Sequence, residues 1–465
     1  MKKTIFAFFL LMLTISIFLC SCTPNDTVSN SLSVDNGEIV SKLEETSSEE
    51  SEPEESRVMI TIKDKADYKN VALEKSYKRT SLYPNDDSPS YPDVNGKEMT
   101  DGKLPSATAS YSDGSYMGFN KNSEDYVLNG YSSITVDLGE LHHLDKFVSY
   151  TGSDAFESVG ISAPAMVVVY VSEDGVAWNK LGESKYECED GSKLGRFVLE
   201  TEYAVSGQYV QYRFVGNLNW MMIAEVEAYG VTGDESIPFY KAENELSFLF
   251  IGNSTTYYFN IPYEFMKITE SAGVNTDVTL CTYGGAYLSQ FADGTTTMGK
   301  LLKEKLAATK YDFIVLQDNG NAEYSDSKPA MDKLIPMVKE NGAIPVLYKR
   351  YSSNDDPAQR PSSALRHHKN YNKLAKDFNI DMNAPVADAF LICNQKYPSI
   401  NLYHTDNSHH SAVGAYLSAC VMAMTFLDID EDDITYNANL EPDVAAKLRE
   451  CARIACETGY DFPES

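Results

Sequence analysis

A serine, an aspartate and a histidine in this chain stand where they could serve one reaction. Ser254 follows an apolar run, "FLFI", and then Gly252, so it is expected at the end of a buried strand, on the turn into a helix. Asp406 precedes His409 by three residues in "DNSHH", a spacing that on a turn brings a carboxylate to one ring nitrogen. The other nitrogen is then free to take a proton from Ser254. A nucleophile, its base and an orienting acid are the three parts of a serine triad.

Acyl transfer by such a serine also needs donors for the oxyanion that develops. Gly285 in "TYGGAYL" has a backbone that can approach a substrate closely, and Asn319 lies in "VLQDNGN" after another apolar run. Each of these residues has an alternative interpretation: Ser254 and Asp406 as helix caps, Asn319 as a loop residue and His409 as a surface or core histidine. Their shared placement at strand ends favours the catalytic interpretation.

The elements that would position these residues begin at about Leu246. The expected strands are "LSFLFI", "DVTLC", "YDFIVLQD" and "AIPVLYKR", and helix patterns alternate with them, the last being "SAVGAYLSACVMAMTFL". Continuous apolar strands alternating with helices predict a parallel sheet covered by helices on both faces. Ligands of such sheets bind beyond the carboxyl ends of the strands, which is where Ser254 is expected.

The same stretch resembles the SGNH (GDSL-like) hydrolase superfamily from about Leu246 to Leu427. The four blocks of that superfamily are matched by Gly252–Ser254, by Gly285, by Gln317–Asn319 and by Asp406–His409. The resemblance implies a three-layer, flavodoxin-like α/β domain over 246–465. It also implies a carboxylic ester hydrolase that needs no metal or organic cofactor.

Residue roles follow from this resemblance. Ser254 would be the nucleophile, His409 its base and Asp406 the orienting acid, while the oxyanion hole would take the amides of Ser254 and Gly285 and the side chain of Asn319. Two departures stand in the blocks: an asparagine replaces the usual aspartate before the serine, and Gln317 replaces a glycine. Gln317 therefore remains an alternative to Asn319 as the side-chain donor, and Gly284 an alternative to Gly285.

Residues 58–232 read as an all-β sandwich, because short alternating runs are separated by Gly, Asp, Asn and Ser. They resemble the discoidin-type (factor 5/8 C) galactose-binding-like domain, including carbohydrate-binding modules of family 32. The matching pieces are "NVALEKSYK", "EMTDGK", "ITVDLGE", "VSEDGVAWNKLG" and "AEVEAYG". The resemblance implies a jelly-roll fold that binds glycan, lipid head groups or protein, with a structural calcium near Asp101 as an open alternative to a plain turn. A connector, 233–245, leads to the hydrolase-like part.

The first residues, 1–22, resemble a bacterial lipoprotein signal: Lys2 and Lys3 precede a short apolar stretch that ends in "LCSC". That resemblance implies lipidation at Cys22, export, and anchoring at the outer face of the bacterial cell membrane. An ordinary secretion signal is the alternative. Residues 23–57 are Ser- and Glu-rich, and we expect a disordered acidic linker there.

The formal net charge of −29 argues against nucleic acid as a partner, since phosphate binding needs clustered Lys and Arg. We therefore predict a cell-surface serine esterase that removes acetyl or other short acyl groups from carbohydrate, with an attached glycan-binding domain. The alternatives are a non-catalytic glycan-binding adhesin, or a lipase, thioesterase or acyltransferase that uses the same triad.

Overall fold

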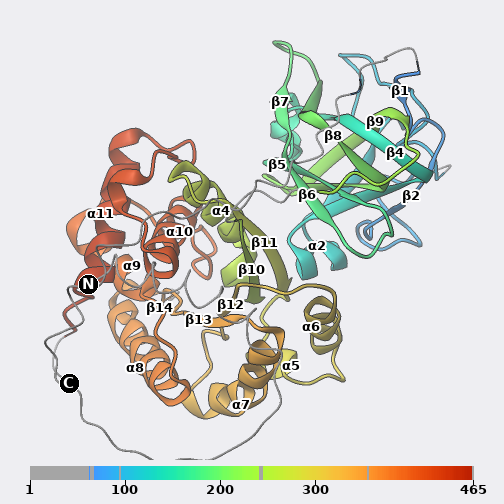
Figure 1. Ribbon diagram of the computed structural model, residues 1–465. Helices are drawn as coiled ribbons and strands as arrows, with labels where there is room; N and C mark the ends of the chain where they lie inside the picture. Colours follow the sequence, from blue (N-terminus) through green and yellow to red (C-terminus); the bar gives the residue numbers. More distant parts are fainter. Residues whose placement is uncertain (1–61, 63–66, 94–95, 240–244, 353–355, 463–465) are drawn as a thin grey trace, which may run out of the picture. The chain divides into compact units, whose positions relative to one another are not determined.

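The computed structural model describes residues 62, 67–93, 96–239, 245–352 and 356–462 (Figure 1). The expected leader (1–22) with its Cys22, and the expected linker (23–57), lie outside these residues. The described residues fall within one compact unit. Within these ranges, no helix has both the length and the apolar character needed to cross a membrane.

Antiparallel β-structure fills the first half of the described chain, as expected (Figure 1). The sheet has nine strands in the order β1-β9-β4-β8-β5-β6, with β2 added to β4, β3 to β9 and β7 to β8. The strands are β1 (Lys69–Asn70), β2 (Ser76–Arg79), β3 (Met117–Asn120), β4 (Ser132–Gly152), β5 (Met166–Ser172), β6 (Asn179–Glu183), β7 (Lys185–Glu187), β8 (Leu194–Val215) and β9 (Trp220–Thr232). The short helix α2 (Glu124–Asn129) and the 3₁₀ turn η1 (Asp154–Val159), neither of them predicted, interrupt the strands.

The long strand β4 bends this β-structure around a core. A register shift between Asp137 and His142 divides it, so that its first part pairs with β2 and its second part with β9. Such irregularities let a strand turn, and here side chains from both parts enter one buried cluster. Val136 and Phe147, from either side of the shift, pack there with Phe214 of β8.

A five-stranded parallel sheet forms the second half, as the alternation of strands and helices predicts. Its strands are β10 (Leu246–Gly252), β11 (Thr276–Thr282), β12 (Phe313–Leu316), β13 (Ile344–Tyr348) and β14 (Asn383–Ala384). They lie in the order β11-β10-β12-β13-β14, and every neighbouring pair is parallel. Counted along the chain this is 2-1-3-4-5, the order of flavodoxin-like sheets.

Helices follow the strands, and several differ from expectation. The helices are α3 (Ser254–Tyr257), α4 (Ile261–Ser271), α5 (Leu288–Phe291), α6 (Thr297–Ala308), α7 (Tyr324–Asn341), α8 (Arg360–Phe378), α9 (Val386–Lys396), α10 (Ala412–Leu427) and α11 (Pro442–Glu457). The prediction that α10 is the last helix is wrong, because α11 follows it and packs its buried Leu448 and Cys451 into the same core. Helix α9 and the two-residue strand β14 were also missed.

The two faces of the sheet bury alternate residues of β10. Phe248 and Phe250 enter a cluster with residues of α4, α9, α10 and α11. Leu249 and Ile251 enter a second cluster with residues of α5, α6, α7 and α8. Helices therefore cover both faces, which leaves the carboxyl edge of the strands as the place for polar chemistry.

The β-structure shares the first of these clusters. Met166, Val168, Tyr170 and Val215 belong to it together with Phe248. The Tyr170 hydroxyl also donates to the carboxylate of Asp277 at 2.9 Å. Removal of the β-structure would expose this apolar surface, so the whole chain is the proper form for functional tests.

Candidate active site

Ser254 lies at the carboxyl end of β10, as expected, and it is the first residue of α3. The cap of that helix is Asn253, whose side-chain oxygen accepts from the Thr255 N–H at 3.0 Å. The interpretation of Ser254 as a cap therefore fails, and its half-buried hydroxyl is available for another partner. Gly252 is required before this turn, because a Cβ there would lie 2.5 Å from the Thr256 hydroxyl oxygen.

His409 supplies the partner of the serine. Its Nε2 lies 2.8 Å from Ser254 Oγ, and its Nδ1 lies 2.8 Å from Asp406 Oδ2. The loop before α10 makes this geometry: Asp406 Oδ1 accepts from the N–H groups of Ser408 (2.9 Å) and His409 (3.0 Å). Asn407 between them has a φ of +56°, a left-handed conformation that asparagine tolerates. The spacing in "DNSHH" thus works as a turn that holds carboxylate and ring together.

The Asp406 carboxyl is held ionised. Partial burial opposes the charge, but the hydrogen bonds from the His409 ring and from the N–H groups of His409 and Ser408 hold its pKa well below the usual range. His404, which sequence analysis passed over, places its Nδ1 3.1 Å from the same Oδ2. One carboxylate oxygen therefore faces two imidazoles.

Tyr258 fixes the plane of the His409 ring. The two rings stack with centroids 4.1 Å apart and an interplanar angle of 16°. Sequence analysis did not identify this contact, because a stack between residues so distant in the chain has no local signal. The stack restricts rotation of the imidazole and so keeps Nε2 directed at Ser254.

The expected oxyanion donors are linked to the turn that carries the serine, because the Asn253 side chain donates to the Ala286 carbonyl at 2.9 Å. The Ser254 N–H is at the start of α3, where a helical N–H has no acceptor within its own helix. Gly285 adopts a φ of +69°, and its carbonyl accepts from Asn319 Nδ2 at 2.7 Å. An amide NH₂ carries two protons, so this bond leaves Asn319 one donor for a ligand.

Gln317 occupies a different position. It is 1% exposed, and its Oε1 accepts from the Asn253 N–H (3.0 Å) and from the Thr256 hydroxyl (2.9 Å). Its Nε2 is bonded to the Asp318 carbonyl. These contacts hold the turn that carries Ser254 and bury Gln317, whereas Asn319 is only partly buried.

Asp318 is a buried organiser that sequence analysis did not identify. Its carboxylate accepts from the Asn319 N–H (2.7 Å), the Leu288 N–H (2.9 Å) and the Ser327 hydroxyl (2.6 Å). Burial raises the pKa of Asp318, although these hydrogen bonds oppose the shift. The residue ties the β12 loop to α5 and α7, and so fixes where Asn319 can point.

His410, His367 and His368 are not part of the hydrogen-bonded series from Ser254 through His409 to Asp406. His410 is fully buried, and neither ring nitrogen has a partner among the described residues, so desolvation lowers its pKa to about 3. His367 is buried too. His368 faces the Asp388 carboxylate at 3.1 Å. None of these three is among the candidate catalytic residues of the sequence, and two of them, His410 and His367, are buried.

Near Asp101, where a structural calcium is the open alternative to a plain turn, the structure places the carboxylate of Glu225. Glu225 is buried, its Oε2 has no partner in the part of the chain that is described, and its Oε1 accepts from Gly102 N–H at 2.9 Å. Burial and the nearby charge of Asp101 raise the pKa of Glu225 to about 8. The described residues hold no group of three or more His, Cys, Asp or Glu side chains that could bind a metal, so backbone carbonyls or water would have to complete a calcium shell.

Comparisons with known proteins give weak likenesses only. Neither the family models nor the curated proteins contain a match. Among solved structures, the chain is similar to a candidate SGNH hydrolase from Slackia heliotrinireducens, with 25% identity and a TM-score of 0.34 over 39% of this chain and 100% of that one. It is also similar to a DUF4886 family protein from Bacteroides uniformis, with 14% identity and a TM-score of 0.40 over 47% of this chain and 98% of that one. A third is CpGH89CBM32-5 from Clostridium perfringens in complex with GalNAc-β-1,3-galactose, with 20% identity and a TM-score of 0.23 over 33% of this chain and 94% of that one. Each TM-score is below 0.5, and the function of this chain is therefore inferred from the geometry of its site.

Proposed function

We propose that this chain is a serine esterase. The observation that carries the proposal is the unbroken line of hydrogen bonds from Ser254 Oγ through the His409 ring to Asp406, with both steps at 2.8 Å. The line lies at the carboxyl edge of a parallel sheet, where substrates of such folds bind. Adhesion alone gives no reason for a hydroxyl, an imidazole and a carboxylate to be aligned in this way.

The reaction follows from the groups in place. Ser254 Oγ attacks the ester carbonyl carbon while His409 Nε2 takes its proton, and Asp406 stabilises the imidazolium through Nδ1–H. Collapse of the tetrahedral intermediate breaks the bond to the alcohol oxygen, which receives the proton from His409. Water then attacks the acyl-serine with the same histidine as its base, and Ser254 regains its proton as the acid leaves.

The negative oxygen of the intermediate would be held by three donors. These are the N–H groups of Ser254 and Gly285 and the second proton of the Asn319 amide. Because one proton of that amide is bonded to the Gly285 carbonyl, the side chain is oriented before substrate arrives. Donors that are already oriented need little reorganisation when the negative charge develops. This is the condition under which an oxyanion hole accelerates acyl transfer.

Short acyl groups on carbohydrate are the substrate class we favour. The cavity beside Asn319 is lined by polar side chains, among them Ser352, Ser363 and His367, which suits a hydroxylated substrate better than a long acyl chain. Transfer of the acyl group to a second sugar would use the same three residues, so a carbohydrate acyltransferase is the second candidate.

The β-structure is proposed as the glycan-binding part of the chain. Partly exposed aromatic rings gather there: Trp220 packs edge-on against Tyr91, with centroids 4.9 Å apart, and against Tyr83 at 5.8 Å. Aromatic rings with one wet face are suited to stacking on sugar rings. Calcium, if bound, would be held by Glu225 and Asp101 and would neutralise their mutual repulsion. Calorimetric titration with calcium, repeated on Glu225→Gln, tests that part.

For its location, we propose an exported lipoprotein attached through Cys22, with the acidic residues 23–57 as a spacer. The formal net charge of −29 fits this arrangement, since only lipid and not a basic surface would hold the protein at an anionic membrane.

Turnover of 4-nitrophenyl acetate by the full chain tests the esterase proposal. We expect Ser254-dependent hydrolysis that falls as the acyl chain lengthens from acetate to octanoate. Equal turnover by Ser254→Ala would exclude this serine as the nucleophile, and a preference for octanoate would favour the lipase alternative. Acetylated xylan offered with a free sugar separates hydrolysis, which releases acetate, from transfer, which acetylates the added sugar.

A further inference from the structure

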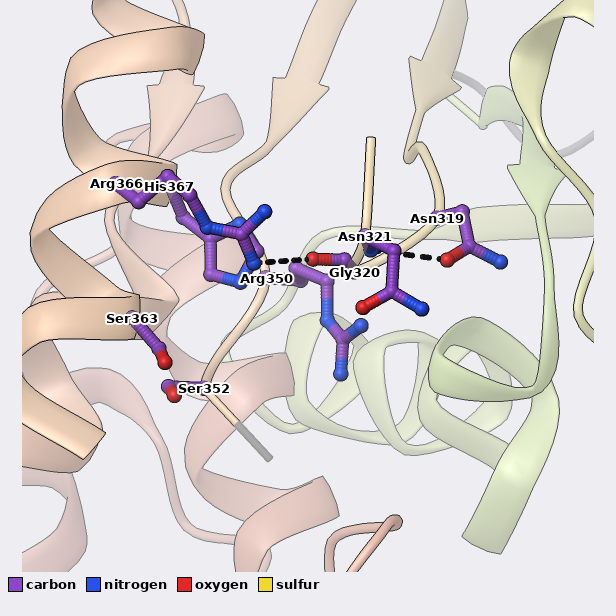
Figure 2. Close-up of a pocket in the computed structure, with 8 residues that line it drawn as sticks. All are labelled: Asn319, Gly320, Asn321, Arg350, Ser352, Ser363, Arg366 and His367. Atoms are coloured by element: carbon purple, nitrogen blue, oxygen red, sulfur yellow. Dashed lines mark hydrogen bonds between the residues drawn. The ribbon is translucent and has the colours of Figure 1, made fainter. Parts of the chain in front are cut away.

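The polar cavity beside Asn319, the proposed oxyanion donor, is also lined by two arginines. Its volume is about 220 Å³, and its walls include Asn319, Arg350, Ser352, Arg366 and His367 (Figure 2). No Asp or Glu is among the described residues that line it. In a chain whose net charge is −29, two arginines converge on Gly320, the residue after Asn319.

Arg350 is a buried part of the cavity wall and not a surface side chain beside it. It follows β13 at the same carboxyl edge that carries Ser254, and it is only 7% exposed. Its guanidinium fits against the backbone of Gly320, where a Cβ would lie 1.6 Å from Nη1. Gly320 is therefore needed for Arg350 to occupy this place.

Arg366 is held in place from α8. Its Nη2 donates to the Gly320 carbonyl at 2.7 Å, the bond drawn in Figure 2, and its Nη1 pairs with Glu323 at 2.8 Å. Both arginines thus contact the loop that carries Asn319. The pKa of His367 is lowered to about 2, first by burial and then by the positive charges of Arg350 and Arg366.

Ser352 gives an independent sign of a ligand. The residue is 2% exposed and lines the cavity, and its Oγ has no hydrogen-bond partner among the described residues. A buried hydroxyl without a partner costs free energy that a bound acceptor would recover. The guanidinium groups beside this hydroxyl are positively charged donors, so an acceptor is the ligand that fits here, and an anionic one fits best.

We propose that the ester substrate is an acidic sugar whose anionic group, a carboxylate or a sulfate, is bound by Arg350, Ser352 and Arg366 while its acyl group lies at Ser254. The inference rests on the proposed esterase function. The cavity is smaller than the roughly 300–1,000 Å³ of sites that enclose a whole drug-sized ligand, so it accepts one substituent of the sugar rather than an oligosaccharide. Asn319 lines the cavity and is the proposed oxyanion donor, so the anionic group and the acyl group of one sugar would lie on either side of it.

The test compares matched substrates that differ in one group. The full chain is offered O-acetylated 4-nitrophenyl glucuronide, the neutral O-acetylated 4-nitrophenyl glucoside, and a sulfated glucoside, and acetate release is measured. Charge-assisted hydrogen bonds contribute enough that we expect kcat/KM for the acidic substrates to exceed the neutral one by roughly ten- to a hundredfold. The better of the glucuronide and the sulfated sugar identifies the anion.

Arg350→Gln should bring the ratio of acidic to neutral kcat/KM to within about threefold of one, mainly through KM. Ser352→Ala breaks no hydrogen bond between described residues, so it should fold normally and lower that ratio severalfold. Arg453→Gln, which removes an arginine of α11 paired with Glu431, is the control and should keep the ratio.

The two proposals can fail separately. Ser254-dependent hydrolysis with equal kcat/KM for acidic and neutral sugars would overturn the anion site and leave the esterase intact. If no ester is hydrolysed, calorimetric binding of glucuronate and of sulfated glucose to Ser254→Ala still decides: binding lost in the additional Arg350→Gln variant supports the site, and binding that is absent or unchanged contradicts it.

Discussion

Replacement of Asp406 by Asn is the most informative single change, because it alters charge and keeps shape. The carboxylate accepts from two backbone N–H groups through Oδ1, and an asparagine oxygen can keep both bonds, so the turn should survive. At Oδ2 the new NH₂ would instead donate to Nδ1 of His409. The imidazole would then carry its proton on Nε2, the tautomer that cannot accept a proton from Ser254.

The size of the effect can be worked from the geometry. With Nδ1 2.8 Å from Oδ2, the charge centres of imidazolium and carboxylate lie roughly 4 Å apart. At an effective dielectric constant of about 20 that pair contributes about 4 kcal/mol, or roughly a thousandfold in rate. The wrong tautomer adds to this, and we expect kcat to fall by about 10³ to 10⁴ with little change in KM.

The assay is hydrolysis of 4-nitrophenyl acetate, with the melting temperature as a check on folding. His404→Gln is the matched control, because it removes the other imidazole from the same carboxylate oxygen and leaves the line to Ser254. Its rate should stay within about tenfold of the wild type. An Asp406→Asn protein that also stays within tenfold would refute the account of His409 as a base oriented by this carboxylate.

The position of the reacting residues was largely predictable, because their signals are local. A strand, a glycine and a serine place Ser254 at the carboxyl edge, and three residues on a turn bring Asp406 to His409. Parallel strands share that edge, so Asn319 could be expected near them. The placement needed no knowledge of how helices pack.

What escaped sequence analysis depends on tertiary contacts. The Tyr258 stack on His409 and the Asp318 bonds to α5 and α7 join residues far apart in the chain, and neither has a periodic pattern. Strand β14 has two residues, too few for an alternation to be visible. Helix α11 was missed although its apolar residues are well spaced, because the resemblance to known hydrolases ends before it.

Three further outcomes are expected. His409→Ala should lower esterase kcat by about a thousandfold or more, whereas His410→Asn should cost stability and keep over a tenth of the rate; the reverse result would mean that the base is His410. Burial lowers the pKa of His367 to about 2 and that of His410 to about 3, so these two side chains gain protons only in the unfolded chain as the pH falls below the usual histidine value. The stability that these two neutral histidines allow is therefore present above that pH and lost below it. The free energy of unfolding should fall by roughly 1.4 kcal/mol for each histidine between about pH 7.5 and 5.5. In His410→Asn the total fall over this pH range should be smaller, because one of the two histidines is absent. A denaturant midpoint with the same pH dependence in both proteins would contradict the assignment. Cys22→Ser should move the protein from the membrane fraction to the medium, and unchanged fractionation would exclude lipidation at this cysteine.

Covalent labelling of the serine tests the central claim most directly. A fluorophosphonate reacts with a serine that a neighbouring base activates, forming a phosphorus–oxygen bond with loss of fluoride, so intact mass and peptide mapping locate the nucleophile. We predict one adduct per chain, on the peptide that contains Ser254, no adduct in Ser254→Ala, and labelling slowed by at least about a hundredfold in His409→Ala. An adduct on another residue, or equal labelling of Ser254→Ala, would contradict the account.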